Sequence, residues 1–144
     1  MSYQFINFNI QDHIARIIFN RPEVYNSIHQ AMAFEIQNAL ELCKSHEVRC
    51  VVVQGSGKAF CAGQDLKEVV DPNGPRLQDI VREHYNPIIK AIRSLDKPVI
   101  CAVNGVAAGA GANIALSGDI VVATHSASFV QAFSKIGLIP DSGG

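Results

Sequence analysis

The stretch KPVICAVNGVAAGAGANIAL, residues 97–116, joins a buried-strand pattern to a turn made of small residues. Apolar and β-branched residues from 98 to 103 predict a strand that is covered on both faces. Glycine and alanine from 105 to 111 then lead into a helix that ends near Leu116. Small residues let a ligand approach the backbone, and the first turn of a helix has N–H groups without intrahelical partners. The stretch therefore predicts a strand, a turn with free backbone donors, and a helix.

A second segment, residues 51–65, follows the same design. Its β-branched strand stops at Gly55, the loop KAFCAG occupies 58–63, and Asp65 opens a short helix at its electropositive end. Two such turns can direct two N–H donors at one oxygen, which is the arrangement of an oxyanion hole. Tight packing of a helix on a strand needs the same small residues, so both interpretations remain open from the pattern alone.

The remaining chain predicts an α/β fold around these two units. Residues 5–10 and 14–19 form a hairpin, and an apolar stripe at helical spacing predicts a helix over 27–45, capped by Asn26 or Ser27. The turn-forming residues 71–75 predict a surface loop or flap, and a second helix is expected over 77–95, with a kink or a new start at Pro87. Strands are expected at 120–123 and 129–133. The order favours one α/β domain whose sheet is covered by helices.

Composition excludes several classes of function. A net charge of −1 over 144 residues gives no electrostatic case for nucleic acid, and no apolar run is long enough to span a membrane. The first residues lack the pattern of a secretory signal. The four cysteines contain no CxxC pair, so we expect reduced core thiols in a cytoplasmic protein. The five histidines fall on turns or polar helix faces without ligand spacing, so no metal site is expected.

Known nucleotide-binding and nucleophile motifs are absent. Gly57-Lys58-Ala59 lacks the hydroxyl residue of a Walker A loop, and Ile114 stands where a dinucleotide fingerprint needs its third glycine. Ser142 is not in a GxSxG elbow.

Several motifs in order resemble those of the crotonase (enoyl-CoA hydratase/isomerase) superfamily. They are NRP at 20–22 with Asn26, AFCAGQDL at 59–66, the stretch at 97–116, SGDIVVA at 117–123 and IGLIPDSGG at 136–144. The resemblance implies the crotonase-type ββα-repeat spiral fold and a homotrimer or a hexamer. Members of this family are nearly twice as long, so we expect residues 1–144 to be the N-terminal part of the core domain and a C-terminal helical part to follow.

The resemblance also implies a site for an acyl-CoA thioester. Its oxyanion donors correspond to the N–H groups of Gln64 and Ala110, and Asp141 corresponds to a proton-shuttling aspartate. The substrate site would be lined by matching positions, which are Glu23, Val24, Tyr25, Ala62, Gly63, Asp65, Leu66 and Asn113. Carbonyl groups near Ala62 and Gln64 would meet the adenine. No cofactor is implied besides the coenzyme A carried by the substrate.

Departures from the family pattern favour an isomerase over a hydratase. Asn113 and Phe133 stand where family hydratases have two glutamates, and neither side chain can exchange a proton at neutral pH. A single carboxylate, Asp141, suits the 1,3-transfer of a proton on an enolate. A turn-capping role in PDSGG is the alternative for Asp141.

A finer resemblance is to the ring-epoxyphenylacetyl-CoA isomerases of phenylacetate catabolism. It rests on VDPNGP at 70–75, HYNPIIK at 84–90, AVNGVAAGAGAN and FSKIGLIPDSGG. These enzymes convert an arene epoxide thioester into an oxepin. A straight-chain enoyl-CoA isomerase or hydratase is the alternative enzyme, and a catalytically silent acyl-CoA-binding protein is the alternative outside enzymes.

Overall fold

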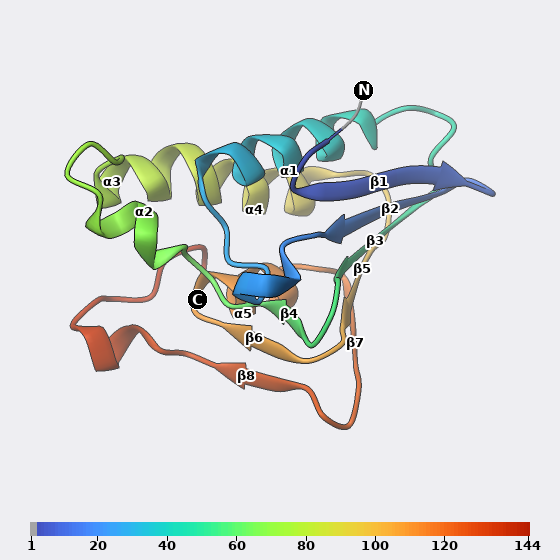
Figure 1. Ribbon diagram of the computed structural model, residues 1–144. Coiled ribbons are helices and arrows are strands. Elements are labelled where there is room, and N and C mark those ends of the chain that lie inside the picture. The colour runs from blue at the N-terminus through green and yellow to red at the C-terminus, as the bar shows by residue number, and fades with distance from the viewer. Residues whose placement is uncertain (1–2) are drawn as a thin grey trace.

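The computed structural model describes residues 3–144, and its main element is a five-stranded sheet (Figure 1). The strand order is β1-β2-β3-β5-β7. Strands β1 and β2 form the expected antiparallel hairpin, and the other neighbours pair in parallel. The strands are β1 (Ile6–Gln11), β2 (Ile14–Phe19), β3 (Cys50–Gly55), β5 (Val99–Val103) and β7 (Ile120–Ala123). The strands predicted from apolar runs are therefore confirmed, but their burial on both faces is not seen in the described residues. Buried and half-buried residues alternate along β3 and β5, and all four residues of β7 are exposed.

A second, three-stranded parallel sheet contains β4 (Ala59–Cys61), β6 (Val106–Ala108) and β8 (Ser128–Val130). The prediction of irregular turns at 58–63 and 105–111 was wrong for β4 and β6. Three-residue strands are too short to show an alternating pattern, and each one pairs with a strand that is distant in sequence. The extended segment expected at 129–133 is also shorter, because a 3-10 helix, η3 (Phe133–Ile136), begins within it.

The two sheets alternate along the chain in a repeated ββα unit. A strand of the larger sheet is followed by a strand of the smaller sheet and then by a helical segment: β3, β4 and α2 (Leu66–Val70), then β5, β6 and α5 (Ala110–Leu116), then β7, β8 and η3. This confirms the spiral α/β fold that the resemblance implied.

The helix α1 (Gln30–Leu42) starts later than predicted. Its N-cap is His29, whose Nδ1 accepts a hydrogen bond from Met32 N at 3.1 Å, so the prediction of Asn26 or Ser27 as the cap was wrong. Asn26 is fully buried and instead bonds to the backbone of neighbouring loops. Asn26 follows a 3-10 turn, η1 (Pro22–Val24), which delays the start of the helix.

The second predicted helix is divided into three parts. These are α3 (Leu77–Asp79), a π-helix η2 (Ile80–Tyr85) and α4 (Asn86–Ser94), with Pro87 in the first turn of α4 as expected. His84 is fully buried in the π-helix, so its predicted place on a turn or polar face was wrong. No helix within residues 3–144 is long and apolar enough to cross a membrane.

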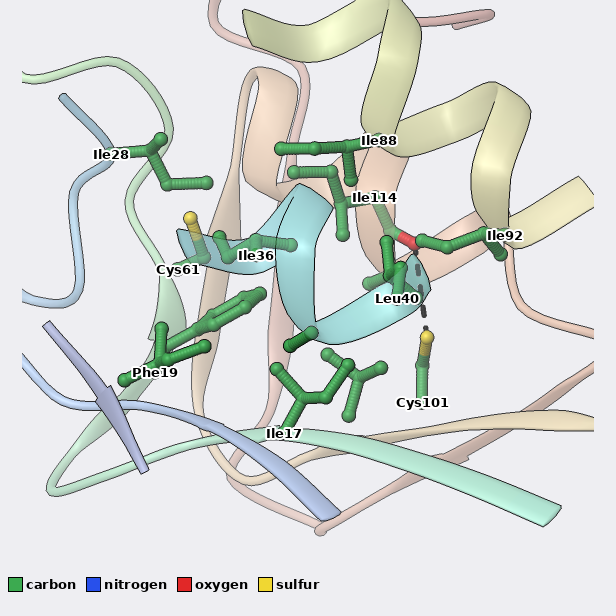
Figure 2. Close-up of a cluster of buried hydrophobic side chains, with 14 of the residues drawn as sticks. Ile17, Phe19, Ile28, Ile36, Leu40, Cys61, Ile88, Ile92, Cys101 and Ile114 are labelled. Atoms are coloured by element: carbon green, nitrogen blue, oxygen red, sulfur yellow. Dashed lines mark hydrogen bonds between the residues drawn. The ribbon is translucent and has the colours of Figure 1, made fainter. Parts of the chain in front are cut away.

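The hydrophobic core lies between the larger sheet and the helices α1, α4 and α5 (Figure 2). It contains Ile36 and Leu40 of α1, Ile88 and Ile92 of α4, Ile114 of α5, and Ile17 and Phe19 of β2. Burying each such side chain stabilises the fold by about 1.5–3 kcal/mol. Cys43, Cys61 and Cys101 are buried as core thiols, and burial raises the pKa of Cys61 and of Cys101 to about 12.

One close contact joins the core to the two glycine-rich turns. A Cβ at Gly111 would lie 2.3 Å from the carbonyl oxygen of Cys61, so only glycine lets α5 lie directly against β4. This contact brings the start of α5 beside the turn that follows β4.

Candidate active site

A pocket of about 670 Å³ opens where the two small-residue turns meet. One side is formed by Ala62, Gly63 and Gln64, and the other by Ala108, Gly109 and Ala110. Apolar side chains of the segment α2–η2 and of η3 form the walls, and Asp141 is the acidic residue among the lining side chains. The remaining lining residues are Val24, Ser27, Leu66, Val69, Leu77, Ile80, Val81, Tyr85, Ala132, Phe133, Ile136 and Leu138.

The backbone around Gln64 is held by a short parallel bridge to Ile28. Ile28 N donates to Gly63 O at 2.7 Å, and Asp65 N donates to Ile28 O at 2.9 Å. The Gly63 carbonyl and the Gln64 N–H belong to one planar peptide unit, so the N–H points away from Ile28. Among residues 3–144, no hydrogen bond uses the N–H of Gln64. Gln64, which lines the pocket, therefore has a backbone N–H that is free of Ile28 and unpartnered.

Ala110 presents a second free donor because it is the first residue of α5. The preceding Gly109 has φ 52° and ψ −125°, a conformation that side-chain-bearing residues rarely adopt, and its own N–H donates to Val130 O at 2.8 Å. Within the described chain, Ala110 N has no acceptor. A Cβ at Gly63 would lie 3.5 Å from Ala110 N, so the two turns are adjacent. The two unpartnered N–H groups therefore belong to adjacent turns that line one pocket.

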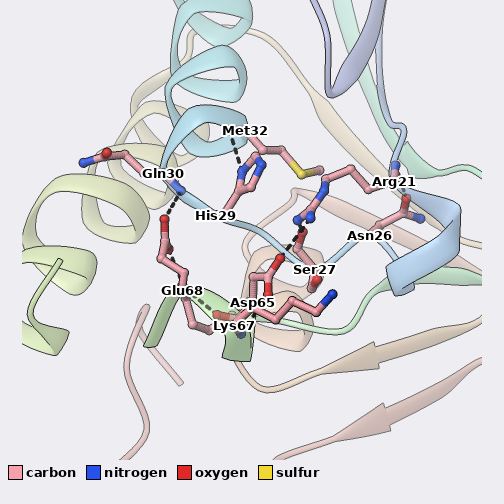
Figure 3. A network of polar contacts seen from close by, with 10 residues as sticks. Arg21, Asn26, Ser27, His29, Gln30, Met32, Asp65, Lys67 and Glu68 are labelled. Atoms are coloured by element: carbon pink, nitrogen blue, oxygen red, sulfur yellow. Dashed lines mark hydrogen bonds and ion pairs between the residues drawn. The ribbon is translucent and has the colours of Figure 1, made fainter. Parts of the chain in front are cut away.

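Polar side chains hold the start of α2 to the segment that precedes α1 (Figure 3). Asp65 accepts from Lys67 N at 3.0 Å to cap α2, and it pairs with Arg21 at 2.9 Å between Nη2 and Oδ2. Arg21 Nη1 also donates to Ser27 O at 2.6 Å. The buried Asn26 accepts from Arg21 N and donates to the carbonyls of Ser56 and Ala59. The NRP motif and Asn26 thus hold the loops that carry the pocket.

Asp141 lies in a tight turn whose backbone is held by Asn113. Asn113 Nδ2 donates to Asp141 O at 2.7 Å, while Gln131 Nε2 donates to Asn113 Oδ1 at 2.7 Å. Ser142 Oγ donates to Asp141 Oδ1 at 2.7 Å. Burial raises the pKa of Asp141 above its ordinary value, and the Ser142 hydroxyl partly opposes this. A carboxylate with a raised pKa in the pocket that the two turns line is suited to accept a proton.

The structure brings together most of the predicted site residues. Val24, Ala62, Gly63, Gln64, Leu66, Ala110 and Asp141 all line the pocket. Four of the predicted positions do not line the pocket. Glu23 and Tyr25 are exposed to solvent, whereas Asp65 and Asn113 are buried and their side chains make the hydrogen bonds described above.

Tyr85 lines the pocket and is nearly fully buried, and it was not predicted from the sequence. The spacing of apolar residues in an α-helix does not indicate that Tyr85 lines the pocket, because a π-helix places it there and that π-helix was not predicted.

The chain matches the enoyl-CoA hydratase/isomerase family over residues 9–144. It is 49% identical to a Rhodobacter capsulatus protein named probable enoyl-CoA hydratase, over 100% of this chain and 55% of that protein. It is 48% identical to 1,2-epoxyphenylacetyl-CoA isomerase of Escherichia coli, over 98% of this chain and 55% of the relative.

A solved structure shows the same fold. The crystal structure of an enoyl-CoA hydratase from Mycobacterium avium subsp. paratuberculosis superimposes with a TM-score of 0.87 and 32% identity, and the match covers 98% of this chain and 53% of that one. The chain thus spans about half the length of the proteins that it matches.

Proposed function

The chain belongs to the enoyl-CoA hydratase/isomerase family, and on this basis we propose that it builds the thioester site of an acyl-CoA isomerase. In this proposal, the N–H groups of Gln64 and Ala110 bind the thioester oxygen, and Asp141 moves the proton. The observation that supports it most directly is that one largely apolar pocket is lined by two residues with unpartnered N–H groups, Gln64 and Ala110, and by the half-buried carboxylate of Asp141.

The chemistry follows from the placement of charge. Loss of a proton from the carbon next to a thioester carbonyl moves negative charge onto the carbonyl oxygen. Two preorganised N–H donors stabilise this oxyanion more than they stabilise the neutral carbonyl. Asp141 takes the proton and returns it at another carbon of the same acyl group, which shifts the double bond.

The acid–base groups favour isomerisation over water addition. Asn113 uses its amide to hold the Asp141 carbonyl and to accept from Gln131, so it does not activate water. Phe133 adds an apolar surface to the pocket. Among the described lining residues, Asp141 is the sole carboxylate, and a single mobile proton is what a 1,3-shift requires.

For the substrate, we propose 1,2-epoxyphenylacetyl-CoA, converted to oxepin-CoA in phenylacetate catabolism. The similarity to the Escherichia coli isomerase and the apolar pocket wall support this choice. The similarity to a probable enoyl-CoA hydratase at nearly the same identity supports a straight-chain enoyl-CoA as the second candidate.

We further propose that the protein acts as a homotrimer or hexamer in the cytoplasm. Ile120 and Val122 of the edge strand β7 are 51% and 56% exposed, and Ile139 is 86% exposed. An apolar surface of this kind is suited to contact with further protein. The free buried thiols are consistent with a reducing compartment.

Replacing Asp141 with asparagine tests the proposed function in the full-length protein. Turnover of the ring-epoxide thioester and of a 3-enoyl-CoA should both be measured, because their ratio separates the two substrate candidates. Loss of a general base costs about a hundredfold to ten-thousandfold in rate, and acyl-CoA affinity should stay nearly unchanged because the oxyanion donors are backbone groups. Asp12→Asn, in the exposed hairpin turn, is the matched control. If Asp141→Asn keeps more than about a tenth of the wild-type turnover, Asp141 is not the base.

A further inference from the structure

A chain of side-chain hydrogen bonds runs from Tyr85 to the start of α1 through the residue that carries one oxyanion donor. Tyr85 Oη donates to Gln64 Oε1 at 2.8 Å, and Gln64 Nε2 donates to Glu68 Oε2 at 2.7 Å. Glu68 Oε1 in turn accepts from Gln30 N, the first N–H of α1, at 2.8 Å. The chain therefore links the π-helix η2, the Gln64 turn, α2 and α1.

The direction of each bond in this chain is determined by its neighbours. Gln64 Nε2 faces the Glu68 carboxylate and, at 3.3 Å, the carbonyl oxygen of Asp65, and both of these groups only accept hydrogen bonds. The amide oxygen of Gln64 must then face Tyr85, so the phenol donates its single proton to Gln64. Burial and the nearby carboxylates raise the pKa of Tyr85 well above its ordinary value, which keeps that proton in place. Tyr85 therefore has no proton to offer a bound substrate.

The π-helix explains why Tyr85 can reach Gln64. Its wider turn buries Ile80, His84 and Tyr85 together. Gln37 of α1 holds this turn in place, because its Nε2 donates to the carbonyl oxygens of Glu83 at 2.7 Å and of His84 at 3.1 Å. Short π-helical turns are frequent at functional sites.

The orientation of the Gln64 N–H is determined by contacts to the backbone and to the side chain of Gln64. Ile28 holds the peptide unit on one side by accepting and donating backbone hydrogen bonds. The side chain on the other side is held by Tyr85 and Glu68. From this geometry we infer that Tyr85 is a positioning residue of the thioester site, which acts through the Gln64 side chain to keep the Gln64 N–H aimed at the substrate oxygen. The inference rests on the proposed function, since it gives Tyr85 a role only if Gln64 N–H binds that oxygen.

The test compares two ligands that differ only at the carbonyl. Hexanoyl-CoA has the thioester oxygen, and S-hexyl-CoA is the thioether without it, so their affinity ratio reports the oxyanion donors alone. Calorimetric titration of the full-length protein should give this ratio for wild type, Tyr85→Phe, Gln64→Met and the double variant. Tyr3→Phe is the matched control, because it removes a tyrosine hydroxyl that bonds to Asn38 Oδ1 at 2.6 Å outside the pocket.

We expect Tyr85→Phe to lower the thioester-to-thioether affinity ratio about three- to tenfold, the size of one net hydrogen bond. S-Hexyl-CoA affinity should not change, and Tyr3→Phe should keep the wild-type ratio. Gln64→Met should lower the ratio similarly, and the double variant should be no worse than either single variant, because both changes break one pathway.

Two results would separate failure of this inference from failure of the proposed function. A wild-type protein that binds both ligands equally has no oxyanion hole, and the proposed function fails with it. A wild-type protein that prefers the thioester, while Tyr85→Phe and Gln64→Met keep that preference, overturns the positioning role alone. Should Tyr85→Phe fail to fold, the ratio for Gln64→Met decides the same question.

Discussion

Replacing Gly63 with alanine adds one methyl group where the two turns of the site meet. Gly63 has φ +90°, and its new Cβ would lie 2.7 Å from Ala108 O and 3.5 Å from Ala110 N. The first distance is shorter than any ordinary contact of a Cβ atom, and its partner is backbone, which yields less readily than a side chain. The methyl group must therefore push the two turns apart.

The loss in the free energy of unfolding that Gly63→Ala causes has two separable parts. A side chain at positive φ costs about 1–2 kcal/mol, and forcing an extra methyl group into a packed site costs about 1–3 kcal/mol. Together they predict a loss of about 2–5 kcal/mol in the free energy of unfolding, a large part of the about 5–15 kcal/mol typical of a domain. Gly137 isolates the first part, because it has φ +71° and nothing within 4 Å of its Cβ position. Gly137→Ala should cost only about 1–2 kcal/mol.

Urea unfolding followed by circular dichroism measures both variants, and titration with hexanoyl-CoA measures the site. Gly63→Ala should be the less stable variant and should lose thioester affinity, whereas Gly137→Ala should keep its affinity. Equal free energies of unfolding for the two variants, within about 0.5 kcal/mol, would show that the turns do not meet as closely as the structure has them.

Three further predictions concern charged groups. Asp141 must be ionised to act as a base, so turnover should fall as the pH drops through its raised pKa. Ser142→Ala removes the hydrogen bond that lowers this pKa, so it should move the acid limb of the pH–rate profile to higher pH. Asp65→Asn breaks a largely buried ion pair and should cost about 3–5 kcal/mol in urea unfolding, whereas Glu41→Gln, in an exposed pair, should cost less than about 1 kcal/mol. Burial lowers the pKa of His84 below its ordinary 6.5, so the native protein loses stability as the pH falls below 6.5 and His84→Leu should flatten that loss in thermal unfolding scans.

The sequence alone determined which segments form the strands of the larger sheet and where the two turns lie, but not the order of those strands. The apolar runs of β3 and β5 indicate strands without any partner being known, because consecutive β-branched apolar residues are typical of strands in a parallel sheet. Glycine and alanine after each strand indicate a close approach of backbone, because larger side chains would prevent it. The pattern located the two turns, whereas Gln64 and Ala110 themselves were named only by the resemblance to the crotonase motifs.

Only the tertiary structure decided which polar groups serve the site and which hold the fold. Asp65 and Asp141 both follow turns near the pocket in sequence, yet Asp65 is paired with Arg21 and Asp141 lines the pocket. The small sheet and the π-helix also escaped prediction, since the strands of the small sheet pair with strands distant in the chain and the π-helix is held by Gln37 of α1. The His29 cap was missed for a local reason, because η1 delays the start of α1. The spacing of apolar residues in a segment indicates which face of that segment is buried. The hydrogen-bond partner of a polar atom depends instead on which other segments the fold places next to it. Tyr85 shows the difference, because its neighbour Gln64 lies 21 positions away and is met only through the turn of a π-helix.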